Sequence, residues 1–512
     1  MLAVGFCAKG RIMKRAIIAI AAVVFVWAGS AGIAVGKVVY VDGRASGADK
    51  GTCWADAYMF LQDGLADANE SEKPVEVWVA QGIYRPDRSA AEPNGAGDRE
   101  ATFSLINGVA LQGGYAGFGE ADPNARDIEL YETVLSGDLD ENDIDVNGPV
   151  DLLDEPTRAE NSYHVVIGSG TDETGVLVDG FTVTGGNANG AYPHNRGGGM
   201  YNIDSSPTVF NCTFTRNSAR EYGGGMYSYW DSGLTLTNCN FSQNWAACGG
   251  GLCASRSSAM LANCSFSGNW AEYGGGMSND DRSNLTLTKC TFSGNSAKSK
   301  DGWEGYGGGM DNFMSDTALT NCTFSGNSAE YGGGMYCYVE SDLRVTNCIL
   351  WGNTAAQGNH IYLSDPHYMS TASISYSDIK GGIAEVFVGA GYTLNWAEGN
   401  IDADPCFADP NKGDYHLKSQ AGRWDPNSQT WIIDANTTPC IDAGNPMTPI
   451  GCEPFPNGGI VNMGAYGGTA EASKSYFGEP PCEIIVAGDI NGDCDVNFLD
   501  FRFMAFHWLE EH

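Results

Sequence analysis

Six oxygen-bearing side chains near the C-terminus are spaced as in a calcium-binding loop. They take positions 1, 3, 5, 7, 9 and 12 of one segment: Asp489, Asn491, Asp493, Asp495, Asn497 and Asp500. A hard cation such as Ca²⁺ takes six or more oxygen ligands, which one tight turn with this spacing can deliver. We therefore expect this loop to bind one Ca²⁺, with Asp495 using its carbonyl and Asn497 binding directly or through water.

The segment after this loop has the pattern of a short amphipathic helix. One stripe of a helix over 501–509 would carry Phe501, Met504, Ala505 and Trp508. Loop and helix together, residues 479–512, resemble a dockerin repeat, which implies a cohesin-like partner. This chain has one copy where dockerins use two, and Cys494 stands where they usually carry glycine. An acidic tail that binds nothing is the alternative.

Calcium binding by residues 479–512 is directly measurable. Four carboxylates lie within the loop, at Asp489, Asp493, Asp495 and Asp500. Each like-charge pair at ~5 Å costs just under ~1 kcal/mol even in water, so Ca²⁺ should order the loop and the helix after it. We expect isothermal titration at millimolar Ca²⁺ to give binding heat and a rise in helix content. No heat and no gain of helix would identify the segment as an acidic tail.

Two further acidic segments are weaker candidates for chemistry. Carboxylates and amides alternate along one of them, at Asp138, Asp140, Asn142, Asp143, Asp145 and Asn147. That spacing could also hold Ca²⁺, although a solvated acidic loop is the better interpretation. Asp280 and Asp281 precede Arg282 on a predicted loop and form an isolated acidic pair. We find no motif of a uronate lyase, a glycoside hydrolase, a nucleophile elbow, a phosphate loop or a zinc site, so no catalytic residue is assigned.

Aromatic residues with adjacent carboxylates recur in the middle of the chain. Three Glu-Tyr pairs each precede a Gly-Gly-Gly run, and two tryptophans take equivalent positions in consecutive repeats: Glu221-Tyr222, Glu272-Tyr273, Glu330-Tyr331, Trp245 and Trp270. Aromatic rungs one strand apart could stack on sugar rings while the carboxylates accept hydrogen bonds from sugar hydroxyls. Structural cover of the groove beside the glycines is the alternative for each tyrosine.

These residues belong to a long repeat. Each copy has Asn-Cys-x-Phe or a variant of it, an asparagine three residues after the aromatic, and Gly-Gly-Gly followed by Met or Leu. The copies are 25 to 32 residues apart, as measured between Cys212, Cys239, Cys264, Cys290, Cys322 and Cys348. Repeats of this period are typical of solenoids.

Each copy contains three short predicted strands and no helical stretch. Residues 234–237 alternate apolar and polar side chains, but Cys239 and Phe241 are out of phase with them. The phase change requires a bend at Asn238, because asparagine tolerates the left-handed conformation. With further corners at the second asparagine and at the glycines, the repeat predicts an all-β chain, a right-handed parallel β-helix of the pectin-lyase-like type with coils ~4.8 Å apart. Leucine-rich and propeller repeats are the alternatives, and their signatures are lacking.

The paired motifs also carry a family resemblance. Phe266-Ser-Gly-Asn269 with Gly274-Gly-Gly-Met277 resembles the repeat of chlamydial polymorphic outer-membrane proteins, over about 180–355. That resemblance implies a surface-displayed β-helix used for adhesion or binding. Gly-Gly-Gly-Met stands where that family more often has Gly-Gly-Ala-Ile.

Stacking of the coils suggests structural roles for two tempting motifs. Aligned cysteines are close in Cα distance, but their side chains run parallel, so we expect a buried apolar ladder instead of disulfides or metal ligands. Asn211, Asn263 and Asn321 match the glycosylation sequon, yet they stand at corners where their amides should stack along the axis.

The repeat is flanked by other segments. A basic start, an apolar run and small residues over 13–34 predict a secretory signal, and an uncleaved N-terminal anchor is the alternative. Residues 54–65 have helical spacing that suits a cap over the first coil. The predicted domains are a signal peptide (1–34), an N-terminal cap with the first coils (35–165), the β-helix repeat region (166–400), a closing segment (401–478) and the dockerin-like calcium module (479–512).

The net charge and the predicted export restrict the functions that the chain can have. With 63 acidic and 28 basic residues the net charge is −35, which repels phosphate backbones and excludes nucleic acid as a partner. The signal indicates a secreted or cell-surface protein. Our leading hypothesis is an adhesin-like β-helix that binds extracellular polysaccharide or another cell surface. The calcium module would retain it, and the dockerin resemblance implies a cohesin-like protein as the docking partner. The alternative is a polysaccharide lyase or glycoside hydrolase delivered by the dockerin-like module.

Overall fold

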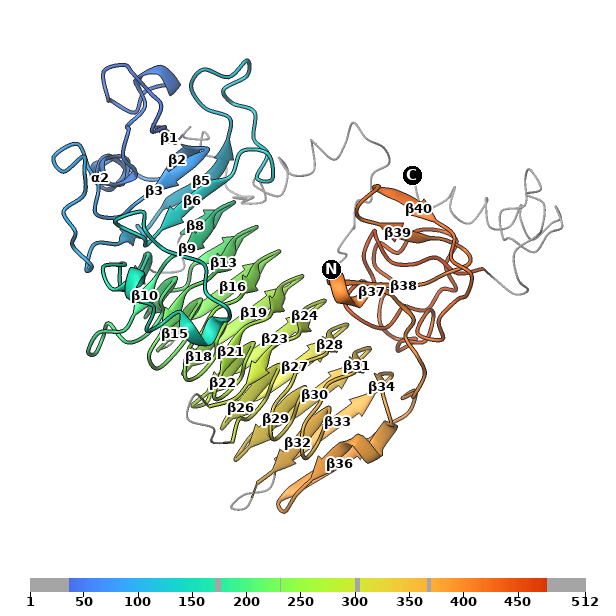
Figure 1. Cartoon of the computed structure of the whole chain (residues 1–512). Coiled ribbons are helices and arrows are strands. Elements are labelled where there is room, and N and C mark those ends of the chain that lie inside the picture. The colour runs from blue at the N-terminus through green and yellow to red at the C-terminus, as the bar shows by residue number, and fades with distance from the viewer. Residues whose placement is uncertain (1–35, 171–175, 231, 300–303, 366–369, 477–512) are drawn as a thin grey trace, which may run out of the picture.

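The computed structural model describes residues 36–476 apart from 171–175, 231, 300–303 and 366–369. Three parallel sheets run the length of a solenoid, as Figure 1 shows, so the predicted all-β parallel β-helix is confirmed. Among the described helices, none has the length and apolarity needed to cross a membrane. The predicted signal (1–34) and the whole calcium module, including Asp489 to Asp500, lie outside the described residues.

Sheet A is the longest sheet, with twelve parallel strands. Its inward leucines align from coil to coil, for example Leu236 beside Leu261 and Leu261 beside Leu287. Its strands are β1 (Lys37–Val41), β2 (Val75–Ala80), β5 (Val109–Tyr115), β8 (Leu177–Asp179), β12 (Thr208–Phe210), β16 (Gly233–Thr237), β19 (Ser258–Ala262), β23 (Asn284–Thr288), β27 (Asp316–Thr320), β30 (Leu343–Thr346), β33 (Ser370–Ser375) and β36 (Tyr392–Trp396).

Sheet B carries the repeated phenylalanine on its inner face. From Phe214 to Phe324, neighbouring rings stack with centroids 4.5 to 4.9 Å apart. Its strands are β3 (Gly82–Tyr84), β6 (Thr133–Ser136), β9 (Thr182–Thr184), β13 (Thr213–Thr215), β17 (Asn240–Ser242), β20 (Ser265–Ser267), β24 (Thr291–Ser293), β28 (Thr323–Ser325), β31 (Ile349–Trp351) and β34 (Asp378–Ile379).

Sheet C follows the glycine runs, and its first residue in most coils is a buried Met or Leu. Its strands are β4 (Phe103–Ser104), β7 (Val166–Ser169), β11 (Met200–Ile203), β15 (Met226–Tyr229), β18 (Leu252–Ser255), β22 (Met277–Asp280), β26 (Met310–Phe313), β29 (Met335–Tyr338), β32 (Ile361–Ser364) and β35 (Val386–Val388).

The corner between sheets A and B confirms the predicted bend. Asn238 has a φ of 55°, and the equivalent Asn211 and Asn263 have φ of 50° and 53°. Their amides stack along the axis, because Asn238 Nδ2 donates to Asn211 Oδ1 at 3.0 Å and Asn263 Nδ2 donates to Asn238 Oδ1 at 2.8 Å. The left-handed corner is what lets Leu236 and Phe241 both face the core.

A second asparagine ladder lies inside the corner after sheet B, next to the short strands β10 (Asn187–Ala188), β14 (Ser218–Ala219), β21 (Trp270–Ala271) and β25 (Ser296–Ala297). Asn269 is representative and 1% exposed. Its Oδ1 accepts from the backbone N–H of Asn244 at 3.0 Å, and its Nδ2 donates to the carbonyl of Phe241 at 2.8 Å. Each such amide therefore joins consecutive coils.

The repeated cysteines form the expected apolar ladder. All six are buried free thiols, so the described part of the repeat contains no disulfide. Burial raises the pKa of Cys212, Cys239, Cys264, Cys290 and Cys322 well above the ordinary thiol value. Such thiols behave as small hydrophobic side chains rather than nucleophiles.

A helix caps the N-terminal end of the solenoid, but it begins later in the sequence than expected. The helix α2 spans Leu61–Glu70, so only residues 61–65 of the expected 54–65 helix are α-helical. Trp54–Asp56 form a separate 3₁₀ turn, η1. Tyr58 lies between them and pairs its backbone with Tyr40 and Asp42 of the first coil. That backbone pairing is incompatible with a continuous helix. The other 3₁₀ turns are η2 (Pro149–Asp151), η3 (Pro156–Arg158), η4 (Gly382–Glu385) and η5 (Pro410–Lys412).

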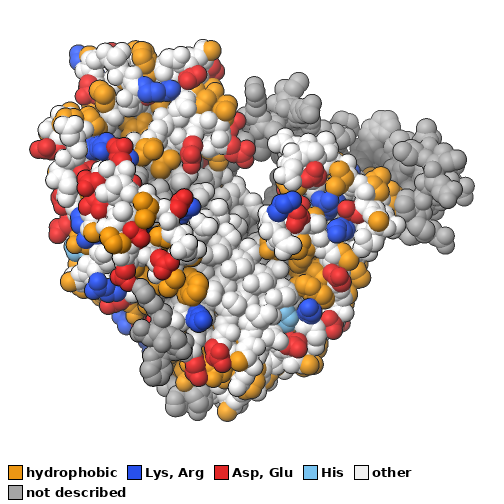
Figure 2. Space-filling model, in the orientation of Figure 1, with side chains coloured by type: hydrophobic (Ala, Val, Ile, Leu, Met, Phe, Trp, Pro, Cys, Tyr) orange, Lys and Arg blue, Asp and Glu red, His pale blue; other side chains and the backbone are white. Residues whose placement is uncertain are grey.

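The C-terminal lobe, 401–476, lies beside the solenoid. It contains two antiparallel hairpins, β37 (Phe407–Asp409) with β38 (Asp414–Leu417) and β39 (Arg423–Asp425) with β40 (Thr430–Ile432). Lys289 donates to the carbonyl of Gly468 at 2.8 Å, and Asn321 donates to that of Asn462 at 2.8 Å. Because these partners lie on successive coils, the expected closing segment packs along the flank of sheet B. Figure 2 shows few charged side chains where solenoid and lobe face each other.

Candidate functional site

The outer face of sheet C presents three rows of side chains along the solenoid. Residues before the glycine run form the first row: Arg196, Tyr222, Cys248, Tyr273, Tyr306, Tyr331 and Gln357. The second residue of each strand forms the second row: Tyr201, Tyr227, Cys253, Ser278, Asp311, Tyr336, Tyr362 and Phe387. The fourth residue forms the third row: Ile203, Tyr229, Ser255, Asp280, Phe313, Tyr338 and Ser364.

The glycine runs allow the backbones of successive coils to lie close together beneath the first row. Gly274 has a φ of 63°, a left-handed conformation that side chains rarely adopt. A Cβ on Gly275 would lie 2.5 Å from the carbonyl oxygen of Gly308, and one on Gly276 would lie 2.6 Å from that of Gly309. Only glycine lets successive coils approach this closely, and Tyr273, Tyr306 and Tyr331, which precede three of the runs, stack as a result.

Aromatic rings over the C-terminal coils form one platform. In the first row, Tyr306 stacks between Tyr273 and Tyr331 with both centroid distances 5.3 Å and interplanar angles of 7° and 13°. In the second row, Tyr362 stacks on Tyr336 at 5.1 Å. Tyr273 is 41% exposed. We call these five tyrosines, with Phe313, Tyr338 and Phe387, the C-terminal platform.

A smaller aromatic group, the N-terminal platform, covers the earlier coils. Its rings belong to Tyr201, Tyr222, Tyr227 and Tyr229. Tyr227 stacks on the other three with centroid distances of 5.5 to 6.0 Å. The guanidinium of Arg196 lies 4.9 Å from the ring of Tyr222 and 3.2 Å from the carboxylate of Glu221. This cation–π contact fixes the end of the platform.

Between the platforms the rows carry small and acidic side chains. Cys253, Ser255 and Ser278 replace the tyrosines there, and two carboxyl groups, Asp280 and Asp311, face the same gap. Asp311 pairs in register with Ser278, whose hydroxyl donates to it at 3.4 Å. Asp280 lies two residues after Ser278 on the same strand. The spacing between strands and the rise per residue therefore place the Cα atoms of Asp280 and Asp311 ~8 Å from each other.

Both carboxyl groups of the gap have raised pKa values. Burial raises the pKa of Asp280 to about 6, with the nearby charge of Asp281 adding to the effect. Asp311 is only 4% exposed, and burial, followed by the charge of Asp280, raises its pKa well above the usual range. Each carboxyl group of the gap therefore keeps its proton to a higher pH than an ordinary aspartate does. An acid and a base of separated pKa are the groups that acid–base catalysis uses.

Of the three predicted tyrosine rungs, Tyr273 and Tyr331 are part of one stacked row, whereas Cys248 separates Tyr222 from that row. Tyr273 and Tyr331 lie on one ladder with Tyr306 between them. Tyr306 was not predicted, because an insertion lengthens its coil and the residue directly before it is not a glutamate. It therefore does not form a Glu-Tyr pair. Asp311 was not predicted either, because its place opposite Ser278 is visible only when the Gly-Gly-Gly-Met units are aligned. Asp280, expected on a loop, ends strand β22.

The tryptophans are not part of this face. Trp245 and Trp270 do pair in register in consecutive coils, but at the corner after sheet B. Trp245 is 6% exposed and packs against Leu152 and Leu153. The indole N–H of Trp270 donates to the carbonyl of Lys298 at 2.8 Å. The expectation that this pair offers a stacking surface to a glycan is therefore wrong for Trp245, which the 146–153 segment covers.

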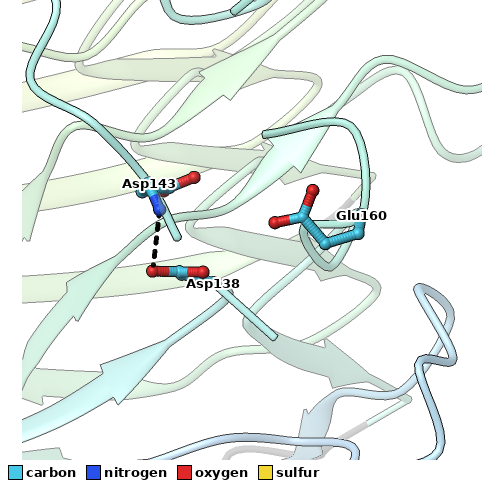
Figure 3. A group of neighbouring side chains, drawn as sticks. All are labelled: Asp138, Asp143 and Glu160. Carbon is cyan, nitrogen blue, oxygen red and sulfur yellow. Dashed lines mark hydrogen bonds between the residues drawn. The ribbon is translucent and has the colours of Figure 1, made fainter. Parts of the chain in front are cut away.

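The acidic segment at 138–147 folds against the solenoid. Carboxyl oxygens of Asp138, Asp143 and Glu160 lie within 4.8 Å of one another, and Figure 3 shows these groups converging. Arg158 is 2.8 Å from Asp143 and also donates to the carbonyl of Gly186. Burial raises the pKa of Asp143 to about 6 against the opposing charge of Arg158. Because arginine supplies the positive charge, this cluster anchors the loop to the coils.

Family models match the middle of the chain. The model described as right handed beta helix region matches residues 163–312 and 201–400. The fold is a right-handed parallel β-helix. A second model, described as disaggregatase related, matches 383–444. No curated protein matches the sequence.

Several solved structures are similar in fold. Pectate lyase Pel9A is 13% identical with a TM-score of 0.43, over 85% of this chain and 97% of that one. A rhamnogalacturonan lyase is 9% identical with a TM-score of 0.33, over 79% and 97%. The tailspike gp49 of Acinetobacter baumannii bacteriophage Fri1, a capsular polysaccharide depolymerase, is 11% identical with a TM-score of 0.30, over 62% and 51%.

Proposed function

We propose that the outer face of sheet C binds an extended chain of an extracellular polysaccharide. The stacked tyrosines of the C-terminal platform are the observation that carries this proposal. Aromatic rings give large apolar area at a low cost in side-chain entropy, and hydroxyls at their edges can hydrogen-bond sugars. Because the rows follow the solenoid axis over successive coils, they suit a long polymer better than a compact ligand.

Removing one rung should weaken glycan binding. Tyr306→Ala deletes the ring between Tyr273 and Tyr331, and we expect it to cost about 1–2 kcal/mol, or about 5- to 30-fold in Kd. A glycan array first selects the ligand, and isothermal titration then compares the variants. Tyr131→Ala, in the loop before β6, is the matched control and should bind as the parent does. The proposal fails if no glycan binds or if the control loses as much affinity.

A second candidate function is hydrolysis of the bound glycan, which the Asp280–Asp311 pair favours. Asp280 would take a proton from water as the water oxygen bonds to the anomeric carbon. Asp311 would give its proton to the leaving oxygen as the glycosidic C–O bond breaks. Release of reducing ends tests this activity.

The same proposal includes an extracellular location and calcium-dependent retention. The basic and apolar residues of 13–34 support export, and the net charge of −35 suits a surface that does not bind nucleic acid. The loop ligands from Asp489 to Asp500 would hold Ca²⁺ in a module that attaches the solenoid, through a cohesin-like protein, to its surroundings. The resemblance of the repeat to chlamydial surface proteins supports an adhesin-like role.

A further inference from the structure

Carboxylates predominate on the face of sheet C. Along the platforms and the gap, the described chain has seven acidic side chains: Glu221, Glu272, Asp280, Asp281, Glu304, Asp311 and Glu330. The basic side chains beside them are Arg196, Arg220, Arg256, Arg282 and Lys298, and two of these are paired with acids. Arg196 is 3.2 Å from Glu221, and Arg256 is 2.5 Å from Asp281. Acidic side chains therefore outnumber basic ones along this face.

Two of the acids lie directly at the stacked rings. The Glu304 carboxylate accepts from the Tyr306 hydroxyl at 2.8 Å and from the Tyr331 hydroxyl at 3.2 Å. Glu272 immediately precedes Tyr273 and accepts from Ser299 at 3.3 Å. A sugar stacked on these tyrosines would thus have its substituents beside carboxylates. Such a position favours a cationic substituent through a charge-assisted hydrogen bond and disfavours an anionic one.

We propose that this face selects polysaccharides built from amino sugars with free amino groups and rejects polymers of uronic acids. The inference rests on the proposed glycan-binding function and names its substrate class. An ammonium group lying beside Glu272 or Glu304 would be attracted by the same carboxylates that repel the carboxylate of a uronate. Neutral sugars would stack without either effect and bind with intermediate affinity.

The test compares three ligands on the full-length protein. Isothermal titration would use oligomers of equal length made of glucosamine, N-acetylglucosamine and galacturonate, at low and high ionic strength. We expect affinity to fall in that order at low ionic strength, with glucosamine at least tenfold tighter than galacturonate and the difference shrinking at high salt. Galacturonate binding as tightly as glucosamine overturns the inference. If all three bind equally, glycan binding stands and the selectivity fails; if none binds, the proposed function fails as well.

A variant pair separates the local effect from the overall negative charge, which attracts any cationic polymer. Glu272→Gln with Glu304→Gln removes two charges beside the stacked tyrosines while keeping the shape of both side chains. Asp122→Asn with Glu129→Gln removes two exposed charges outside sheet C. We expect the first pair to lower the glucosamine-to-galacturonate affinity ratio at least threefold and the second pair to leave it unchanged. Equal losses from both pairs would attribute the attraction to net charge and overturn the inference.

Discussion

Asn269→Ala is expected to lower the free energy of unfolding by about 3–5 kcal/mol. The side chain joins three coils, because it accepts from the backbone N–H of Asn244, donates to the carbonyl of Phe241 and donates to Asn295 Oδ1. Its removal leaves a buried donor and a buried acceptor without these partners and opens a small cavity in the corner. Urea unfolding followed by circular dichroism measures the change.

An exposed asparagine provides the control for this experiment. Asn284, at the start of strand β23, faces solvent, and Asn284→Ala should change stability by less than about 0.5 kcal/mol. A loss below 1 kcal/mol for Asn269→Ala, or equal losses in the two variants, would mean that the amide ladder contributes little to holding the coils together. The solenoid would then depend on its apolar rows alone.

Replacing the gap carboxyls should produce the second large effect. If the protein hydrolyses its glycan, Asp280→Asn and Asp311→Asn should each reduce kcat by about 10²- to 10⁴-fold, because the reaction loses its base or its acid. Glycan affinity should change little, since asparagine keeps the size of aspartate. Asp281→Asn is the neighbouring control, because Asp281 pairs with Arg256 instead of facing Asp311.

The pH profile follows from the directions of the two pKa shifts. Asp280 must be ionised to act as the base, so the rate should rise with pH through about 6, the pKa that burial gives it. Asp311 must stay protonated to act as the acid, and burial raises its pKa, so the rate should fall once Asp311 ionises. Measuring reducing ends across pH, with the parent and the three variants, checks the assignment. A parent protein that binds glycan but releases no reducing ends leaves binding as its function.

The repeat determines the fold because its pattern is local. The phase change between 234–237 and Phe241 could be satisfied only by a corner, and asparagine stands where that corner needs a left-handed residue. Stacking of identical side chains then follows from the repeat itself, as the rings of Phe214 to Phe324 show. Fold, corners and the cysteine ladder were predictable for this reason.

The candidate site depends on relations between coils, which are harder to read from the sequence. The gap depends on the pairing of Ser278 with Asp311, which are in register although the coils that carry them differ in length. Trp245 has the same type and spacing as an exposed rung, but a loop from more than ninety positions earlier, around Leu152, covers it. The shift of the capping helix to Leu61–Glu70 likewise reflects backbone pairing of Tyr58 with the first coil.

A crystal structure with a bound oligosaccharide tests the central claim most directly. The account predicts sugar rings stacked along the first row, over Tyr273, Tyr306 and Tyr331, with the chain direction following the solenoid axis and passing the gap at Asp280. Sugar bound instead on sheet B or on the C-terminal lobe, with the face of sheet C free, would contradict it.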